Sequence, residues 1–272
     1  MPHPTRLYFL CLTLLLLGGA ALPALGREGV DVGKNSAFTK LISAEQLEQS
    51  AALQYQQLLG QAREKNALAP KDHPQLRRLQ SIARKIIPFT TEWNPRATQW
   101  RWEVNLLGSS QINAFCMPGG KIAFYTGILD KLQLTDDEVA MVMGHEIAHA
   151  LREHARERMG KTAATNLGTS LLSQVLGLGQ LGQTAANYGA QLLTLEFSRQ
   201  DESEADLVGM ELAARAGYNP RAGVSLWRKM AAANKNAPPQ WLSTHPSSST
   251  RISEIEANLP KVEPLYQRAR PR

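Results

Sequence analysis

Cysteine is scarce in this sequence. The chain has two cysteines in 272 residues, and Cys11 lies inside an apolar N-terminal segment. If that segment is removed, Cys116 is the only cysteine left, so the mature chain can form no internal disulfide bond. Cys116 is predicted to be a small core-facing residue, with a reactive thiol as the alternative. Stability therefore has to come from a hydrophobic core, to which a bound metal could add.

The sequence also lacks a basic stripe with interleaved aromatic residues. Its formal net charge is +6, but the basic residues lie in mixed runs such as residues 151–159, LREHARERM. Alternating glutamate and arginine is typical of a solvated helix face. We therefore do not expect the chain to bind nucleic acid. A length of 272 residues, 43% of them hydrophobic, suffices for one sizeable domain and a short extra element.

The longest apolar run lies at the N-terminus. Arg6 precedes apolar residues 7–17, and the segment ends with Ala24-Leu25-Gly26. This pattern predicts a secretory signal peptide over residues 1–26 and export to a bacterial periplasm. The alternative is an uncleaved anchor, because residues 7–25 lack charge and are almost long enough to span a bilayer. A retained segment would associate the protein with the membrane.

Residues 162–195 contain no charged side chain. Their five glycines and many serine, threonine, asparagine and glutamine residues argue against a membrane span. We predict a pair of weak helices packed on the body of the protein. Two alternatives stay open, a mobile flap beside the active site and a peripheral contact with a membrane surface.

Apolar residues at helical spacing predict two scaffold helices in the first third of the chain. A capping box at Ser43–Gln46 precedes the first, which extends to residue 62, and the second covers Pro74–Ile87. Residues 27–40 show no periodicity. Residues 27–73 are therefore predicted to form a leader and a helix, ahead of a main domain over residues 74–260.

The period of the apolar pattern changes to two in the middle of the chain. Residues 100–104 alternate between apolar and charged side chains, which predicts a half-buried strand. Two more strand-like runs, Gln111–Met117 and Lys121–Thr126, are joined by Pro118-Gly119-Gly120. Such a turn is typical of a hairpin.

Three further helices are predicted after the strands. A capping box at Thr135 begins a long helix that should run to about Met159. The others cover Arg199–Ala216 and the neighbourhood of Ile252–Leu259, and residues 261–272 are predicted to be a basic C-terminal tail. The fold class is therefore α+β and mostly α-helical, with a small β-sheet.

Residues 145–149 read His-Glu-Ile-Ala-His. Four residues of helix turn the chain by one turn plus about 40°, so His145 and His149 project from one face. Both imidazoles can then bind one zinc ion at about 2.0–2.1 Å. Glu146 lies at the edge of this face and is predicted to be the general base that deprotonates a zinc-bound water. The alternative is two buried histidines and an exposed glutamate.

A catalytic zinc site needs a third protein ligand and an open position. In metzincins the third ligand is a histidine six residues after the second, but residue 155 is alanine. His154 is one position early, and we predict that it lies on the surface.

Glu202 and Asp206 are better placed to complete the site. They lie four residues apart at the start of a later helix and so share one face. Gly209, a small residue on that face, would allow close packing against the histidine helix, and Gly144 gives that helix room to approach a neighbour. We predict that Glu202 binds the metal and that Asp206 accepts a hydrogen bond from a histidine ring nitrogen. The alternative is a solvated acidic helix start, stabilised by the helix dipole.

Four spaced motifs together resemble one protein family. They are Asn113–Gly120 (NAFCMPGG), Gly144–His149 (GHEIAH), Glu202–Asp206 (ESEAD) and Ser243–Pro246 (STHP). The sequence resembles the HtpX and CAAX-prenyl-protease family of gluzincin metalloproteases, especially its exported BepA- and LoiP-like branch. The resemblance covers residues 75–259. It implies a zincin-type domain with the histidine motif on a central helix, a small sheet lining the cleft, and one zinc ion per chain.

The resemblance also implies roles for residues outside the histidine motif. The strand at Asn113, Ala114 and Phe115 would form the cleft wall and pair with extended substrate as an added strand. His245 would lie near the metal and regulate access, although it could simply be a turn residue before a proline. Arg251 would order the cleft or stabilise the oxyanion.

The activity implied is that of a zinc-dependent endopeptidase of the bacterial envelope. Its partners would be unfolded or misassembled envelope polypeptides, cleaved as a form of quality control. The alternative is a latent, chaperone-like assembly factor that uses the same cleft for binding with little hydrolysis. The helical repeats of some relatives are not seen in this sequence, and the oligomeric state stays open.

Overall fold

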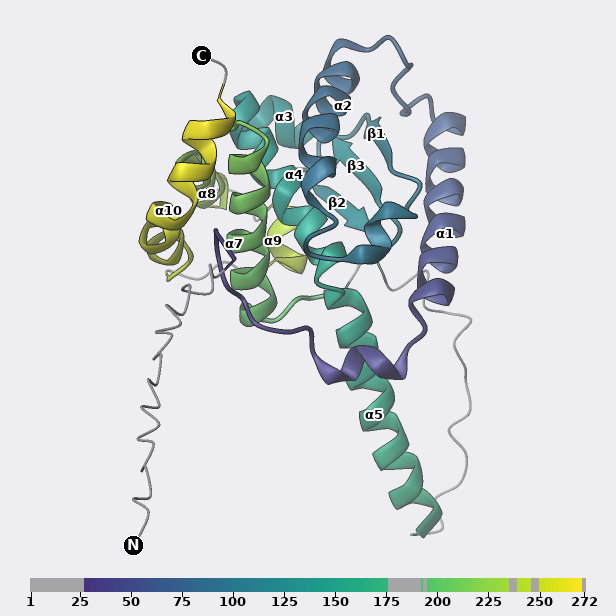
Figure 1. The fold of residues 1–272 in the computed structure, drawn as a ribbon. Helices are drawn as coiled ribbons and strands as arrows, with labels where there is room; N and C mark the ends of the chain where they lie inside the picture. The colour runs from purple at the N-terminus through teal and green to yellow at the C-terminus, as the bar shows by residue number, and fades with distance from the viewer. Residues whose placement is uncertain (1–26, 176–191, 193–194, 235–238, 246–249, 271–272) are drawn as a thin grey trace, which may run out of the picture.

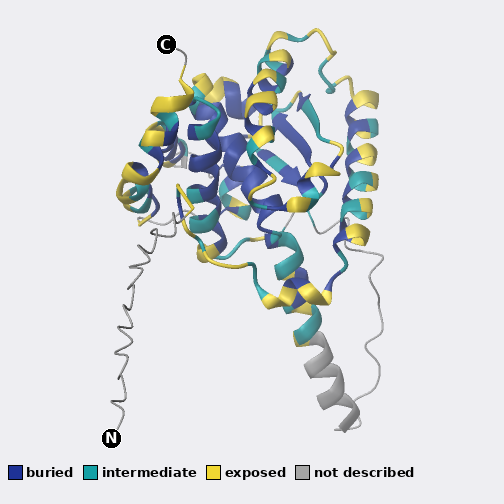
Figure 2. Cartoon of the chain, viewed as in Figure 1, coloured by how far each residue is buried: buried dark blue, intermediate teal, exposed yellow. Residues whose placement is uncertain are grey.

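The computed structural model describes residues 27–175, 192, 195–234, 239–245 and 250–270. The helix α4 (Asp136–Leu151) lies at the centre of the fold (Figure 1). The helices α7 (Arg199–Arg215), α8 (Ala222–Asn234) and α10 (Thr250–Ala269) lie on one side of it, and α2 (Pro74–Ile86) and a small sheet lie on the other. Figure 2 shows that α4 is almost entirely buried. The predicted α+β class, with the histidine motif on a central helix, is confirmed.

The scaffold helices begin where the capping signals indicate. Ser43 accepts a hydrogen bond from the backbone N–H of Gln46 at the start of α1 (Ala44–Glu64). The buried Tyr55 of α1 donates from its hydroxyl to the carbonyl of Ile122, which ties α1 to the sheet. The remaining short elements connect these layers: η1 (Ala37–Leu41), η2 (Ile87–Phe89), η3 (Pro95–Thr98), α3 (Thr126–Leu132) and α9 (Gln240–Thr244).

The sheet has three strands in the order β1-β3-β2. The strands β2 (Ala114–Met117) and β3 (Lys121–Tyr125) form the expected antiparallel hairpin, and β1 (Glu103–Leu107) pairs with β3 in parallel. The strand predicted at residues 100–104 therefore lies further along the chain. Trp100 and Trp102 instead pack on each other before β1 begins, and the ring of Trp102 covers Gly120. The strand β2 is left at the edge of the sheet.

The long helix predicted to reach Met159 ends earlier. It stops at Leu151, Glu153 takes a left-handed conformation with φ of 59°, and α5 (His154–Val175) begins as a separate helix. No glycine or proline marks this break. Tertiary contacts hold it, because the side-chain amide of Asn94 donates to the carbonyl of Leu151 and the guanidinium of Arg152 donates to the carbonyl of Gly33, each at 3.1 Å.

The C-terminal segment is also more ordered than expected. The helix α10 extends to Ala269, so residues 261–269, predicted to belong to a basic tail, continue a packed helix. Val262 and Leu265 are buried, and α10 packs along α7. The boundary predicted after residue 260 therefore does not separate a tail from the domain.

The helices α4 and α7 cross at two glycines, Gly144 and Gly209. A Cβ atom on Gly144 would lie 2.5 Å from the carbonyl oxygen of Gly209. A Cβ atom on Gly209 would lie 2.5 Å from the backbone nitrogen of His145. Both distances are far inside van der Waals contact, so only glycine allows this approach. The crossing brings the histidine helix against the helix that carries Glu202.

The N-terminal leader is anchored on α7 by a buried carboxylate. Glu211 is fully buried and accepts hydrogen bonds from the guanidinium groups of Arg27 (2.5 Å) and Arg215 (2.8 Å). It also accepts one from the backbone N–H of Val30 at 2.8 Å. Arg27 stacks over Trp93 with its guanidinium carbon 3.8 Å from the ring centroid. The segment predicted to follow the signal peptide is thus part of the folded domain.

We expect Glu211→Gln to destabilise the protein by about 2 kcal/mol, because two arginines lose their shared charged partner in a buried setting. Urea unfolding of the purified chain measures this. The matched control is Glu28→Gln, whose side chain is 54% exposed and pairs with an exposed Arg268. It should change the free energy of unfolding by no more than about 0.5 kcal/mol. Equal effects of the two substitutions would contradict the anchoring role of Glu211.

The structure describes only part of the two segments for which the sequence suggests membrane contact, residues 1–26 and 162–195. Within the described residues, no helix has the length and apolar character needed to cross a bilayer. The predicted signal peptide lies outside those residues, as does most of the second half of the uncharged segment 162–195. The first half of that segment continues α5 as far as Val175.

Candidate metal centre

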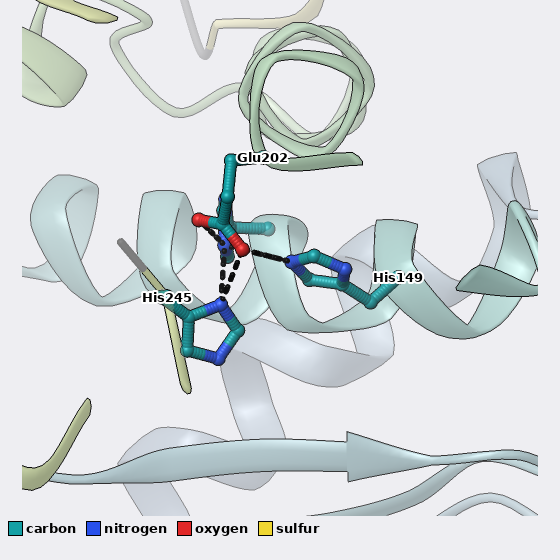
Figure 3. A group of neighbouring side chains, drawn as sticks. His149, Glu202 and His245 are labelled. Carbon is teal, nitrogen blue, oxygen red and sulfur yellow. Dashed lines mark hydrogen bonds and ion pairs between the residues drawn. The ribbon is translucent and has the colours of Figure 1, made fainter. Parts of the chain in front are cut away.

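The predicted site residues from three separate segments meet in the interior. The helix α4 contributes His145, Glu146 and His149, each no more than 3% exposed. Glu202 projects from the first turn of α7 and is fully buried. His245 follows the short helix α9 and is also buried. Figure 3 shows Glu202 reaching from one helix towards His149 on another, with His245 facing both.

Four side chains converge on one point. Donor atoms of His145, His149, Glu202 and His245 all lie within 4.8 Å of one another. The Nε2 atoms of His145 and His149 are 3.1 Å apart, and the carboxylate of Glu202 lies 3.6 Å and 3.3 Å from them. Nδ1 of His245 lies 2.9 Å from Glu202 Oε1 and 3.3 Å from Nε2 of His145.

This donor set fits a divalent metal ion. Tetrahedral coordination with bonds of about 2.0–2.1 Å places ligand atoms about 3.3–3.4 Å apart, close to the separations of these four atoms. His145 donates from Nδ1 to Asp206, so its Nε2 presents a lone pair to the other donors. Lone pairs and a carboxylate that converge in a buried place repel one another unless shared protons or a metal cation lie between them. The residues would therefore hold a metal through two or three imidazoles and one carboxylate.

Asp206 and Arg251 form hydrogen bonds to two of the converging side chains, His145 and Glu202. Asp206 lies 3.0 Å from Nδ1 of His145 and receives two hydrogen bonds from Arg251, at 2.6 and 2.7 Å. Arg251 also donates to Glu202 at 2.6 Å. Although burial acts to raise the pKa of Asp206, the charge of Arg251 and the contact with His145 hold that pKa below its usual range. The carboxylate of Asp206 fixes the ring orientation of His145 through this contact.

The surroundings of Arg251 bear on its two predicted roles. Its guanidinium carbon lies 3.7 Å from the ring centroid of Trp227, and its side chain is 3% exposed. Its hydrogen bonds to Glu202 and Asp206 place it on the α7 side of the donor set, away from the cavity. This geometry favours ordering of the site over contact with an oxyanion.

Glu146 is held apart from the converging donors. Its Oε1 accepts a hydrogen bond of 2.6 Å from the indole N–H of Trp241, and the same oxygen lies 3.6 Å from Nε2 of His245. Burial raises the pKa of Glu146 above its ordinary value, against the opposing effect of the nearby histidines. A carboxylate with raised proton affinity beside the donor set suits a general base.

A cavity of about 280 Å³ opens beside these residues. Its wall includes Asn113, Ala114 and Phe115, which lie at the start of the edge strand β2, together with Glu146 and His149. The segment Asn113–Phe115, predicted to form the wall of a cleft, therefore lines this cavity. Cys116 is buried next to them, and burial raises the pKa of its thiol well above the usual value, as expected of an inert core cysteine.

The sequence patterns miss three residues of the site. Trp241 is buried, stacks on His245 with ring centroids 4.7 Å apart and donates to Glu146. Phe197 stacks on His149 at 3.9 Å. His154, predicted to lie on the surface, is 1% exposed and contacts His149. Trp241 and Phe197 lie outside the recognised motifs, and the prediction for His154 is wrong because the helix breaks just before it.

The sequence matches one peptidase family and several named metalloproteases. The family model described as "Peptidase family M48" matches residues 74–259. The mitochondrial metalloendopeptidase OMA1 of Schizosaccharomyces pombe is 34% identical over 72% of this chain and 56% of its own length. Metalloprotease LoiP of Escherichia coli is 30% identical over 54% of this chain and 58% of its own. The β-barrel assembly-enhancing protease of Yersinia pestis is 28% identical over 63% of this chain and 37% of its own.

Proposed function

The chain belongs to peptidase family M48, and on that premise we propose that it is a zinc-dependent endopeptidase that cleaves unfolded polypeptides. The family membership confirms the resemblance and the enzyme class expected from the sequence, with relatives that include LoiP and the β-barrel assembly-enhancing protease. The chain spans little more than half the length of its S. pombe relative, so its own activity is argued from its site. The observation that carries the proposal is the buried group of His145, His149 and Glu202 beside Glu146.

The proposed roles follow from the contacts of each residue. When bound, zinc would supply Lewis acidity at the three donors His145, His149 and Glu202. Glu146, outside the donor set and hydrogen-bonded to Trp241, accepts the proton from the attacking water and later returns it to the leaving amine. Asp206 and Arg251 keep His145 and Glu202 in place.

The edge strand supports an extended polypeptide as the substrate. An edge strand has free backbone N–H and C=O groups, and a substrate segment that pairs with them is held straight along the strand. β2 lies at the sheet edge, and Ala114 and Phe115 line the cavity beside Glu146. Because a folded chain rarely offers an unpaired extended segment, this geometry selects unfolded protein over native protein.

The proposed location is the bacterial envelope. The predicted signal peptide supports export, and one relative is named for β-barrel assembly. Relatives named as mitochondrial show that the same domain is also used in other compartments. Misfolded or stalled periplasmic and outer-membrane polypeptides are therefore the substrates we propose.

A second candidate function rests on His245. Its Nδ1 lies 2.9 Å from Glu202 Oε1, close enough for both atoms to bind one metal ion. Its Nε2 lies 3.6 Å from Glu146, so the ring stands between the donor set and the general base. With His245 in the fourth position, the site would be closed to a water molecule. The protein would then be latent, and would act as a binding or assembly factor until His245 moves.

The test is cleavage of casein, an unfolded protein, by the full chain before and after metal removal. We expect a chelator to reduce the rate at least 100-fold and stoichiometric zinc to restore it. Cleavage that is insensitive to chelation would overturn the metalloprotease proposal. No cleavage by zinc-loaded wild type, together with cleavage by His245→Gly, would favour the latent state.

A further inference from the structure

The buried His154 forms a contact that the proposed reaction does not explain. It is the first residue of α5, and the left-handed Glu153 before it turns its ring back towards α4. Its Nδ1 lies 2.9 Å from Nδ1 of His149, with the two rings 5.0 Å apart and nearly perpendicular. The other nitrogen, Nε2, lies 3.4 Å from Oε2 of Glu204.

The proton positions along this chain of contacts follow from the metal site. A metal held by Nε2 of His149 leaves the single proton of that ring on Nδ1. Nδ1 of His154 must then accept a hydrogen bond from this N–H group, because two N–H groups cannot face each other at 2.9 Å. The proton of His154 is consequently on Nε2, which points at the Glu204 carboxylate. The hydrogen bonds therefore run in one direction, from His149 Nδ1 to His154 Nδ1 and from His154 Nε2 to Glu204.

Glu204 is itself held in place. Arg152, 5% exposed, donates to its Oε2 at 3.1 Å, and the guanidinium of Arg152 also donates to the carbonyl of Gly33 at 3.1 Å. Glu204 lies two positions after Glu202 on α7, and its carboxylate contacts Arg152 and His154 at the break between α4 and α5. The carboxylate is therefore fixed by contacts that do not involve the donor set.

We propose that His154 and Glu204 are positioning residues that hold His149 in its metal-binding tautomer through a Glu204–His154–His149 chain of hydrogen bonds. This proposal rests on the metal site of the proposed function. Each histidine of the motif then has its own carboxylate, Asp206 directly for His145 and Glu204 through His154 for His149. A carboxylate at the end of such a chain raises the basicity of the ligand nitrogen and lowers the entropy lost on binding.

The first test is the tautomer of each histidine in the zinc-loaded wild-type chain, measured by nitrogen-15 NMR of the imidazole rings. We expect His149 to be protonated at Nδ1, and His154 to be protonated at Nε2 with a bare Nδ1. A His154 protonated at Nδ1 would overturn the proposal. This measurement needs no variant, and so it does not depend on how a substitution affects folding.

The second test is zinc affinity by chelator competition. We expect His154→Phe, which keeps a ring but loses the acceptor, to bind zinc about 10- to 100-fold more weakly than wild type. His154→Asn places an amide oxygen near the former Nδ1 and should bind within about threefold of wild type. Glu204→Gln keeps a hydrogen-bond acceptor without the charge, and its zinc affinity should lie between those of the two His154 variants. Wild-type affinity in His154→Phe would overturn the proposal.

Phe197→Leu is the matched control for packing. It removes the ring that stacks on His149. That ring makes none of the hydrogen bonds that join Glu204, His154 and His149. We expect its zinc affinity to fall by less than about threefold, and a loss as large as that of His154→Phe would assign the effect to packing and overturn the proposal. Zinc binding without proteolysis in wild type would count against the proposed activity alone, whereas no zinc binding would remove the basis of both.

Discussion

Glu146→Gln should abolish proteolysis and leave the metal site intact. The amide has the shape of the carboxylate and can still accept the hydrogen bond from Trp241, but it cannot take a proton from water. Loss of a general base typically costs about 10²- to 10⁴-fold in rate. Zinc stoichiometry should remain one per chain, because Glu146 is not among the four converging donors.

The measurement is the rate of casein cleavage together with the zinc content of each purified protein. Glu64→Gln, at the exposed end of α1, removes the same charge far from the site and serves as the control. It should cleave at the wild-type rate. If Glu146→Gln also cleaved at that rate, the activity would belong to another residue or to a contaminating protease.

Gly209→Ala should weaken both the fold and the metal site. The added methyl group would lie 2.5 Å from the backbone nitrogen of His145 and 2.7 Å from the carbonyl carbon of Gly144. Backbone atoms of a buried helix cannot move aside singly, so α7 must shift away from α4. That shift carries Glu202 away from the histidines. We expect a loss of about 1–3 kcal/mol in the free energy of unfolding and at least tenfold weaker zinc binding.

Gly60→Ala is the matched control for the same chemical change. Gly60 lies within α1, and a Cβ atom there would meet no atom within 4 Å. Alanine should therefore be neutral or stabilise the protein by up to about 1 kcal/mol through its higher helix propensity. Urea unfolding and chelator competition measure both effects. An unchanged unfolding midpoint and zinc affinity in Gly209→Ala would contradict the close crossing of α4 and α7.

Local patterns predict the beginnings of elements better than their ends. The capping boxes at Ser43 and Thr135 each mark the start of a helix, because a cap is formed by residues a few positions apart. The end of α4 after Leu151 carries no such signal. It depends on residues distant in sequence, such as Asn94, whose amide donates to the carbonyl of Leu151, so local patterns alone predict a continuous helix to Met159.

The same distinction applies to the site. The four-residue spacing of His145 and His149 determines that both rings leave one face of a helix, whatever surrounds them. The sequence by itself also supplies the glycines that permit the α4–α7 crossing and the carboxylates that share a face of α7. These are properties of single helices, and the structure places each of them as expected.

Tertiary structure alone decided what surrounds those residues. Trp241 reaches Glu146 across 95 positions of sequence and Arg251 reaches Asp206 across 45. His154 turns inward to His149 after the break between α4 and α5, where Asn94 donates to the carbonyl of Leu151. Such contacts have no period and no fixed spacing, since they arise where separate elements meet. The sequence therefore determined which side chains could bind a metal, and the packing of α4, α7, α9 and α10 decided which others would orient them.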